Sequence, residues 1–371
     1  MRLRGADPII ARIQHTLPWF VHNGMIHLSV PHGIEQYNGG AWGTRDVTQG
    51  SLELLLALGR CASCREILLL IYQHQFLGQH HWPQWFMTGP FGWIQQAHCH
   101  GDIPLWPIKA LCDHLEATCD FAILDAAVAW TQPGSAATTT TTSSLLDHVA
   151  ANLAWLRANC IPGTALLRYG GGDWNDSLQP ARPEFRERLV SSWSVALCYQ
   201  VLRRLEHASH RSGRTFPGLA GLAAAVAADF RRHLIIDGTL CGFFLFDAGS
   251  SSRGQPLLHP RDQLTGIPYR LLPMTRSMLG DLFTPAEAAS HDALIRQHLL
   301  AADGARLMDR PPAYRGGGGV RFSNAPNSAP ASPAKSASST PTPTSAISRP
   351  WLTSATPMPC STAWAASPRP P

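Results

Sequence analysis

Residues 168–178 read Arg168-Tyr-Gly-Gly-Gly-Asp-Trp-Asn-Asp-Ser-Leu178, a loop that connects two stretches of helical periodicity. Its three glycines allow a tight turn or a close approach of the backbone to a ligand. Two carboxylates, Asp173 and Asp176, flank a tryptophan and an asparagine. A turn in which Asp and Asn cap a helix accounts for one carboxylate but not for the tryptophan between them. We therefore interpret the stretch as a catalytic loop, with a capping turn as the alternative.

Helical patterns surround this loop on both sides, and strand signals are few. Apolar residues at helical spacing predict helices at Ser51–Leu58, Glu66–Phe76, Pro107–Ala117, Asp120–Ala129, Leu145–Asn159, Glu184–Arg204, Leu219–Leu234 and His291–Leu300. The best strand candidate is Cys241–Phe246, and Thr131–Ser144, with its threonine run, is expected to be a surface loop. Helices joined by loops rich in Trp, Gly, His and Asp indicate an all-α toroid whose loops at one end carry the site.

The last part of the chain differs in composition. From Pro311 onward there is no Asp, Glu or His, and Pro, Ser, Ala and Thr dominate. Such a segment buries too little apolar surface to offset its chain entropy. We expect a helical domain over residues 1–315 and a disordered tail over residues 316–371. A frameshift in the coding sequence is one explanation for the tail.

The overall composition narrows the function classes. Hydrophobic residues make up 44% of the 371 residues, and no apolar run reaches the roughly 20 residues that a membrane span needs. We therefore expect no membrane partner and, without a signal-peptide pattern, a cytoplasmic location. The net charge of +5 is modest and the arginines are dispersed, so nucleic acid is not an expected partner.

Many of the twelve tryptophans stand among polar residues and glycines rather than among aliphatic ones, as Trp42 and Trp174 do. Flat apolar faces beside planar hydrogen-bonding groups suit a sugar ring. Packing of aromatic side chains within loops is the alternative. The histidines at 74, 80 and 81 have no carboxylate at ligand spacing beside them, so we expect no metal site.

Gly172-Asp-Trp-Asn-Asp176 resembles the signature of the cellobiose-phosphorylase family, glycoside hydrolase family 94. Trp42-Gly-Thr-Arg-Asp46 is similar to a second segment of that family. Further stretches resemble the branch that acts on β-1,2-linked glucans, the 1,2-β-oligoglucan phosphorylases and the related part of cyclic β-1,2-glucan synthases. They begin at Pro31 (PHGIEQY), Trp82 (WPQWFM), His100 (HGDIPLWPIKA) and Tyr269 (YRLLPM). The resemblance covers roughly residues 10–315 and implies an (α/α)6 toroid.

The resemblance also implies roles for individual residues. Asp176 falls on the family's catalytic acid, Trp174 lines the donor-sugar site, and Asp46 grips sugar hydroxyls with Arg45 beside it. We add Asp173, Asp102 and Trp42 as candidate substrate-binding residues, and Arg168 and Arg270, with Arg45, as candidate phosphate ligands.

Three function hypotheses follow. The first is inverting phosphorolysis of β-1,2-linked oligoglucans to α-glucose 1-phosphate, with inorganic phosphate as co-substrate and no cofactor. The second is an inverting hydrolase on the same fold, with Asp46 or Asp173 as the base for water. The third is an inactive, truncated sugar-binding fragment, because an N-terminal sandwich domain and a phosphate-binding histidine of the family find no counterpart and Gly40 replaces a phosphate-binding arginine. The partners expected are oligosaccharide and phosphate, and a homodimer is left open.

Overall fold

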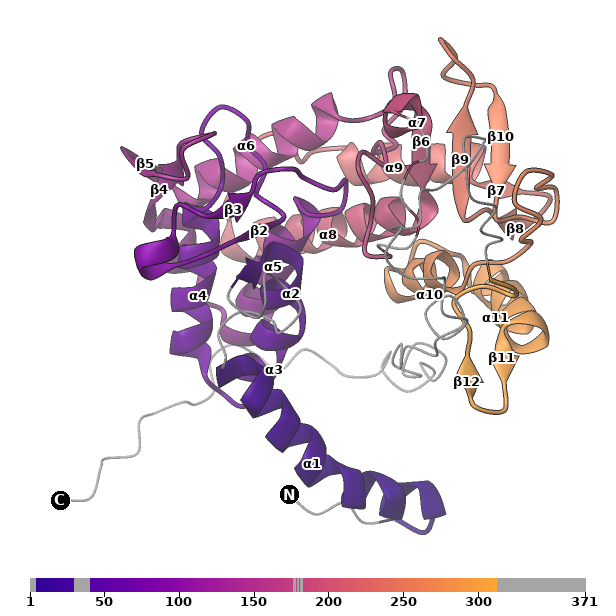
Figure 1. Cartoon of the computed structure of the whole chain (residues 1–371), viewed down its shortest axis with the longest axis horizontal. Coiled ribbons are helices and arrows are strands. Elements are labelled where there is room, and N and C mark those ends of the chain that lie inside the picture. The colour runs from indigo at the N-terminus through magenta and orange to yellow at the C-terminus, as the bar shows by residue number, and fades with distance from the viewer. Residues whose placement is uncertain (1–4, 30–40, 176–177, 179, 181–182, 312–371) are drawn as a thin grey trace.

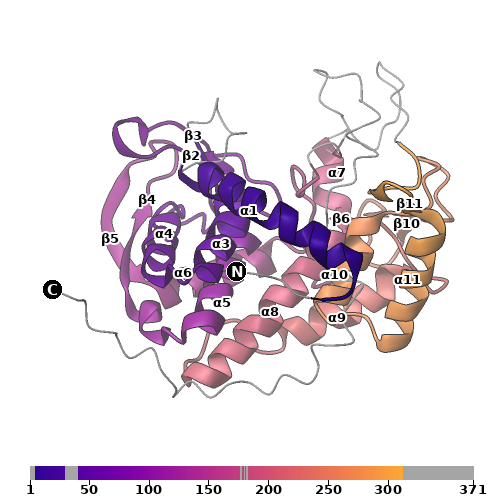
Figure 2. The ribbon, with the colours of Figure 1, turned by 90° about the horizontal axis from the view of Figure 1, so that it is seen from below.

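The 21-residue helix α8 (Ser192–Ser212) runs through the middle of the molecule (Figure 2). Its apolar residues Val201, Leu205 and Ala208 recur at helical spacing and are buried. Gly213 then takes the left-handed conformation, with φ of 66°, that ends many helices. The computed structural model describes residues 5–29, 41–175, 178, 180 and 183–311.

Four further helices gather around α8, namely α4 (Cys61–Gln73), α5 (Leu105–Thr118), α9 (Leu222–His233) and α10 (Leu271–Leu279). Helices α5, α9 and α10 contact α8, and α4 packs on α5 (Figure 1). Helix α5 is buried along most of its length because it lies between two neighbours. Its Pro107 stands in the first turn, where the missing N–H has no helical partner to lose.

The other described helices are shorter or lie at the edges of this group: α1 (Pro8–Ser29), α2 (Thr44–Asp46), α3 (Leu52–Ala57), α6 (Leu145–Ala158), α7 (Pro183–Arg188) and α11 (Pro285–His298). Single turns of other helical types occur at Val47–Ser51, Gly89–Phe91 and Phe121–Asp125. Capping boxes begin two of the helices. Ser144 and Asp147 exchange hydrogen bonds at the start of α6, and Thr284 and Glu287 do so at the start of α11.

Antiparallel strands form five small sheets within the described residues. They are β1-β2-β3 (Trp42–Gly43, Trp85–Phe86, Gln95–Gln96), β10-β9-β6 (Gly254–Leu257, Phe243–Phe246, Leu189–Ser191), β4-β5 (Ala127–Thr131, Thr138–Ser144), β7-β8 (Ile235–Ile236, Thr239–Leu240) and β11-β12 (Leu300–Ala301, Gly304–Ala305). The sequence-based prediction of an all-α toroid is therefore wrong. Most of these strands have two to four residues, too few to show an alternation in the sequence, whereas β4 and β5 have five and seven residues.

Six of the predicted helices are confirmed with shifted ends, as α3, α4, α5, α6, α9 and α11, and the predicted strand is β9. The predicted helix at Asp120–Ala129 is wrong, because a 3-10 turn and strand β4 occupy it. The predicted loop at Thr131–Ser144 is wrong as well. Its threonines form β5, in keeping with the preference of β-branched side chains for strands.

The predicted single helix Glu184–Arg204 is also wrong, because β6 interrupts it. Residues 183–188 form α7, Leu189–Ser191 pair with β9, and α8 begins at Ser192. The interruption lies at the wall of the site described below. The predicted domain boundary between residues 315 and 316 lies outside the described residues.

Buried side chains form two clusters. The larger one fills the space between the helices, and the smaller one packs around the sheet β10-β9-β6. Tyr169, at the start of the glycine-rich loop, belongs to the smaller cluster, whereas Trp174 packs against the larger one. The loop thus passes from one cluster to the other.

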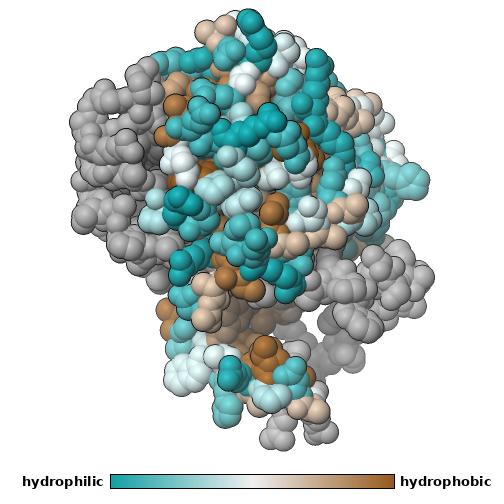
Figure 3. All heavy atoms as spheres, turned by 90° about the vertical axis from the view of Figure 1, so that its right-hand side faces the viewer, coloured by the Kyte–Doolittle hydropathy of each residue, from teal (hydrophilic) through white to brown (hydrophobic). Residues whose placement is uncertain are grey.

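Helix α1 projects away from this body (Figure 1). The face that carries β7–β10 and α11 is hydrophilic for the most part, while apolar atoms are visible on the projecting helix (Figure 3). None of the helices in the described part of the chain is long and apolar enough to cross a membrane.

Candidate active site

The glycine-rich loop is held against the turn at His100–Asp102 by close backbone contact. The amide of Gly101 donates to the carbonyl of Gly172 at 3.0 Å, and the amide of Tyr169 donates to Leu189 in β6 at 2.7 Å. Gly170 has a φ of +61°, which favours glycine, and a Cβ atom at Gly171 would lie 2.3 Å from Nε2 of His98. The backbone conformation at Gly170 and the space at Gly171 therefore favour a residue without a side chain.

Asp173 is fully buried, and several groups of the protein donate hydrogen bonds to its carboxylate. Oδ2 accepts from the Ser191 hydroxyl at 2.6 Å and from Nη2 of Arg270 at 3.0 Å. Oδ1 accepts from the backbone amide of Asn175 at 2.9 Å. The carboxylate thus links its own loop to β6 and to the start of α10.

The Arg270 guanidinium is almost completely buried, at 1% exposure, beside this carboxylate. Besides Asp173, it donates to the Ser191 hydroxyl and to the carbonyl of Gly242, each at 3.3 Å. It lies over the ring of Phe243, with its central carbon 4.4 Å from the ring centroid. Burial of an arginine requires such pairing because an unpaired buried charge is costly.

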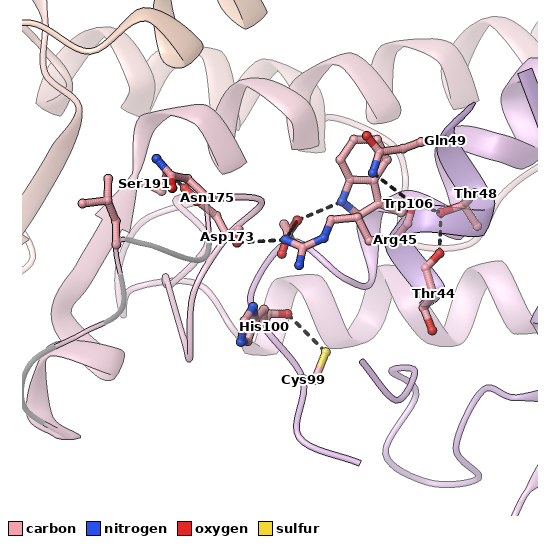
Figure 4. A network of polar contacts seen from close by, with 12 residues as sticks. Thr44, Arg45, Thr48, Gln49, Cys99, His100, Trp106, Asp173, Asn175 and Ser191 are labelled. Atoms are coloured by element: carbon pink, nitrogen blue, oxygen red, sulfur yellow. Dashed lines mark hydrogen bonds and ion pairs between the residues drawn. The ribbon is translucent and has the colours of Figure 1, made fainter. Parts of the chain in front are cut away.

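A second arginine, Arg45, points toward Asp173 (Figure 4). Its Nη1 donates to the backbone carbonyl of Asp173 at 2.8 Å and lies 3.4 Å from Oδ2 of Asp102. The same Asp102 oxygen accepts from the Trp106 indole at 2.8 Å. Asp102 is fully buried and Arg45 is 5% exposed, so two buried acid–arginine pairs meet at the backbone of residue 173.

Arg45 stands in an irregular helical segment. Its carbonyl accepts from the side chains of Thr48, at 3.0 Å, and Gln49, at 3.0 Å. The segment continues as a π-helical turn, Val47–Ser51, in which Gln49 departs from helical geometry. Turns of this kind are frequent at functional sites. Asp46, beside Arg45, is half-buried on the same turn.

Trp42 belongs to an aromatic stack near this segment. Its ring lies 6.1 Å from that of Phe86, and Phe86 stacks on His74 with ring centroids 3.7 Å apart. Burial lowers the pKa of His74 to about 4, so this imidazole is neutral at pH 7. The stack is therefore uncharged, and its three rings are buried.

The structure therefore brings together Arg45, Asp102, Asp173 and Arg270. Trp42 and Asp46 lie on the same short segment as Arg45. Trp174 is half-buried and lies on the same loop as Asp173. Arg168 lies apart from them, since its guanidinium pairs with Glu187 and donates to Asn159. Asp176 lies outside the described residues. The roles given to these residues stay predictions.

Sequence reasoning missed Ser191 and the part that Trp106 plays. The sequence-based prediction placed Ser191 inside the helix Glu184–Arg204, whereas in the structure it precedes α8, makes no cap bond through its side chain and donates its hydroxyl to Asp173. Trp106 stands four residues after Asp102, one helical turn, which is a signal that could have indicated their contact. Among the described residues, no three His, Cys, Asp or Glu side chains are arranged to hold a metal ion.

The sequence of the chain is similar to that of a named enzyme. The chain is 39% identical over 319 residues to the 1,2-beta-oligoglucan phosphorylase of Listeria innocua. This similarity supports a phosphorylase-like family. It covers 86% of the chain but 29% of the relative, so the chain spans less than a third of that protein's length.

No protein-family model matches the chain. Among solved structures, a family 78 rhamnosidase from Bacillus sp. GL1 matches 63% of this chain and 22% of its own, at 12% identity and a TM-score of 0.41. That likeness is too weak to assign a fold family.

Proposed function

We propose that this chain carries the catalytic site of a phosphorylase that cleaves β-1,2-linked oligoglucans with inorganic phosphate. The observation that carries the proposal is the 39% identity, over 86% of the chain, to a 1,2-beta-oligoglucan phosphorylase. No cofactor is proposed, phosphate is the co-substrate, and the partners proposed are oligosaccharide and phosphate.

In this proposal Asp176 is the general acid of an inverting reaction. Its proton goes to the glycosidic oxygen while a phosphate oxygen bonds to the anomeric carbon from the opposite face and the glycosidic C–O bond breaks. The products are α-glucose 1-phosphate and the shortened oligoglucan. Trp174 and Asp46, which are both half-buried, offer a flat face and hydrogen bonds to the sugar. Asp102 and Arg45 pair with each other and hold the backbone of the site.

The surroundings of Asp173 argue against this carboxylate as the base of an inverting hydrolase. An inverting hydrolase needs a second carboxylate as the base that activates water, and Asp173 is one of two candidates. Its oxygens already accept bonds from Ser191, Arg270 and the amide of Asn175, which fixes it as an ion-pair partner. Phosphate is already a nucleophile at neutral pH, so phosphorolysis requires no such base.

The first prediction tests this function directly. Residues 1–371 are incubated with β-1,2-linked oligoglucans, with and without phosphate, and glucose 1-phosphate is measured. We expect release only with phosphate, and a loss on the order of 10²–10⁴-fold in the Asp176→Asn variant, since Asn cannot supply the proton. Asp292→Asn, on the surface of α11 and paired with Arg296, is the matched control and should retain activity.

Two outcomes would overturn the proposal. Release of free glucose without phosphate would indicate a hydrolase. A folded chain that yields no glucose 1-phosphate would show that it lacks the activity. Full activity of Asp176→Asn would instead assign the acid to another residue.

A further inference from the structure

We propose that Arg270 is a positioning residue for the loop that carries Trp174 and Asn175, acting through Asp173, and is not a phosphate ligand. The inference rests on the proposed function, since the loop leads directly to Asp176. It is drawn from the contacts of Arg270, which differ from those expected of a residue that receives a substrate.

The first argument is that both terminal nitrogens of the guanidinium already have partners in the protein. Nη2 of Arg270 lies 3.0 Å from Oδ2 and 3.3 Å from Oδ1 of Asp173. Nη1 donates to Ser191 and to the carbonyl of Gly242. Both terminal nitrogens therefore have oxygen partners from the protein, and the side chain is 1% exposed. Nε of Arg270 is buried and makes no hydrogen bond within the described residues, but phosphate that bound either terminal nitrogen would break the Asp173 pair and leave a buried carboxylate alone.

The second argument is what the pair does to the loop. The Asp173 carboxylate accepts from the amide of Asn175 at 2.9 Å, which closes a turn around Trp174. Arg270 therefore fixes the orientation of a carboxylate that in turn fixes the backbone of the next two residues. The planar fork of arginine suits this task because it can bond to Asp173 and Ser191 together.

The third argument is that Asp173 is held by two arginines, one at its backbone and one at its side chain. Arg45 donates to the backbone carbonyl of Asp173 at 2.8 Å, while Arg270 holds the side chain. The ring of Phe243 packs against one face of the guanidinium, so Arg270 has little room to rotate away. Residue 173 is thus fixed in both backbone and side chain, three residues before the proposed acid.

The test uses Arg270→Lys, which retains the charge but loses the fork, and Ser191→Ala, which removes one support of Asp173 without changing charge. Because small misplacements of catalytic groups are costly, we expect Arg270→Lys to lower kcat on the order of 10²-fold. The KM for phosphate should stay within about two-fold. Ser191→Ala should lower kcat less, and the double variant should fall short of the product of the two effects.

The matched control is Arg204→Lys. Arg204 stands on α8 and makes a comparable double ion pair, with Asp113 and Glu116, away from the loop. It should leave kcat unchanged. A second measurement, hydrogen exchange of the full chain, should show faster exchange of the Asn175 amide in Arg270→Lys and not in Arg204→Lys.

The outcomes are distinct. A large rise in the KM for phosphate with kcat unchanged would make Arg270 a phosphate ligand and overturn the inference. Unchanged exchange at Asn175 would overturn it as well. If the unmodified chain releases no glucose 1-phosphate, the proposed function fails, while the exchange measurement still decides whether Arg270 positions the loop.

Discussion

At the scale of single residues, the site keeps its charges inside the protein by pairing each acid with an arginine. Asp102 with Arg45 and Asp173 with Arg270 are both deeply buried pairs. Removal of one member leaves the other charge buried and alone, which costs far more than the pair contributes. Substitutions at these positions therefore need controls for folding before any loss of activity is interpreted.

His74 gives a prediction for pH dependence. Its pKa is about 4 in the folded protein and 6.5 when unfolded, so the unfolded state takes up the proton first as the pH falls. Stability due to the neutral His74 is present above pH 6.5 and is lost as the pH falls toward 4, by about 3 kcal/mol. We expect His74→Phe, which retains the stack on Phe86, to lose less stability between pH 7 and 4 than the unmodified chain by about that amount.

Urea unfolding at both pH values measures the difference. Carboxylates elsewhere in the chain also titrate in this range, so only the comparison between the two proteins is informative. Equal losses in both would show that His74 is hydrated or protonated in the folded state.

At the scale of elements, helices with a clear apolar stripe were predictable from sequence and short strands were not, and the 22-residue α1 was missed. Leu145–Asn159 shows a clear apolar stripe and is α6 to within a residue. Strands of two residues such as β1 depend on a partner distant in the chain, and no local pattern marks them. Strand β6, which interrupts the predicted helix Glu184–Arg204, was missed for the same reason: Leu189–Ser191 pair with β9, a strand distant in the chain.

The candidate site was predictable to the extent that its residues stand in recognisable short segments. Asp173, Arg45 and Asp102 were all chosen from such segments, and the structure brings them into contact. Their partners were not predictable, since nothing local indicates that Arg270 would meet Asp173 or that Ser191 would donate to it. Contacts between distant segments are fixed by packing rather than by local sequence.

Gly101 provides a prediction about how two elements meet. A Cβ atom there would lie 2.6 Å from the carbonyl oxygen of Tyr169 and 2.8 Å from that of Arg168. Both are backbone atoms and cannot rotate away, so Gly101→Ala should force the two loops apart. We expect a loss of about 1–3 kcal/mol in the free energy of unfolding, measured by urea denaturation.

Gly50→Ala is the control, because a Cβ atom at Gly50 meets nothing within 4 Å. Equal midpoints for the two alanine variants would mean that the contact between Gly101 and the glycine-rich loop is looser than described.

At the scale of the whole molecule, helix α1 stands out as an apolar projection. Trp19 is 69% and Phe20 is 68% exposed, whereas core aromatics such as Phe230 are fully buried. Exposed apolar surface of this kind promotes association between molecules. We expect Trp19→Ser with Phe20→Ser to reduce light scattering at high concentration and to change stability by less than about 0.5 kcal/mol.

Phe230→Ser is the contrasting substitution, expected to lower stability by about 3–5 kcal/mol because it removes a buried ring. A marked fall in the melting temperature of the Trp19 and Phe20 variant would show that α1 packs on the body through those side chains.

The separation along the chain of the paired residues has a consequence for the order of folding. Arg45 and Asp102 are 57 residues apart, Asp173 and Arg270 are 97 apart, and Arg45 and Asp173 are 128 apart. Contacts that close such long loops form slowly, because the chain loses its freedom before it gains the contact. The helical body closes loops of similar length, since Arg204 on α8 meets Glu116 on α5 across 88 residues. The charged centre should therefore form together with the helical body, and partly folded chains should lack competence for chemistry.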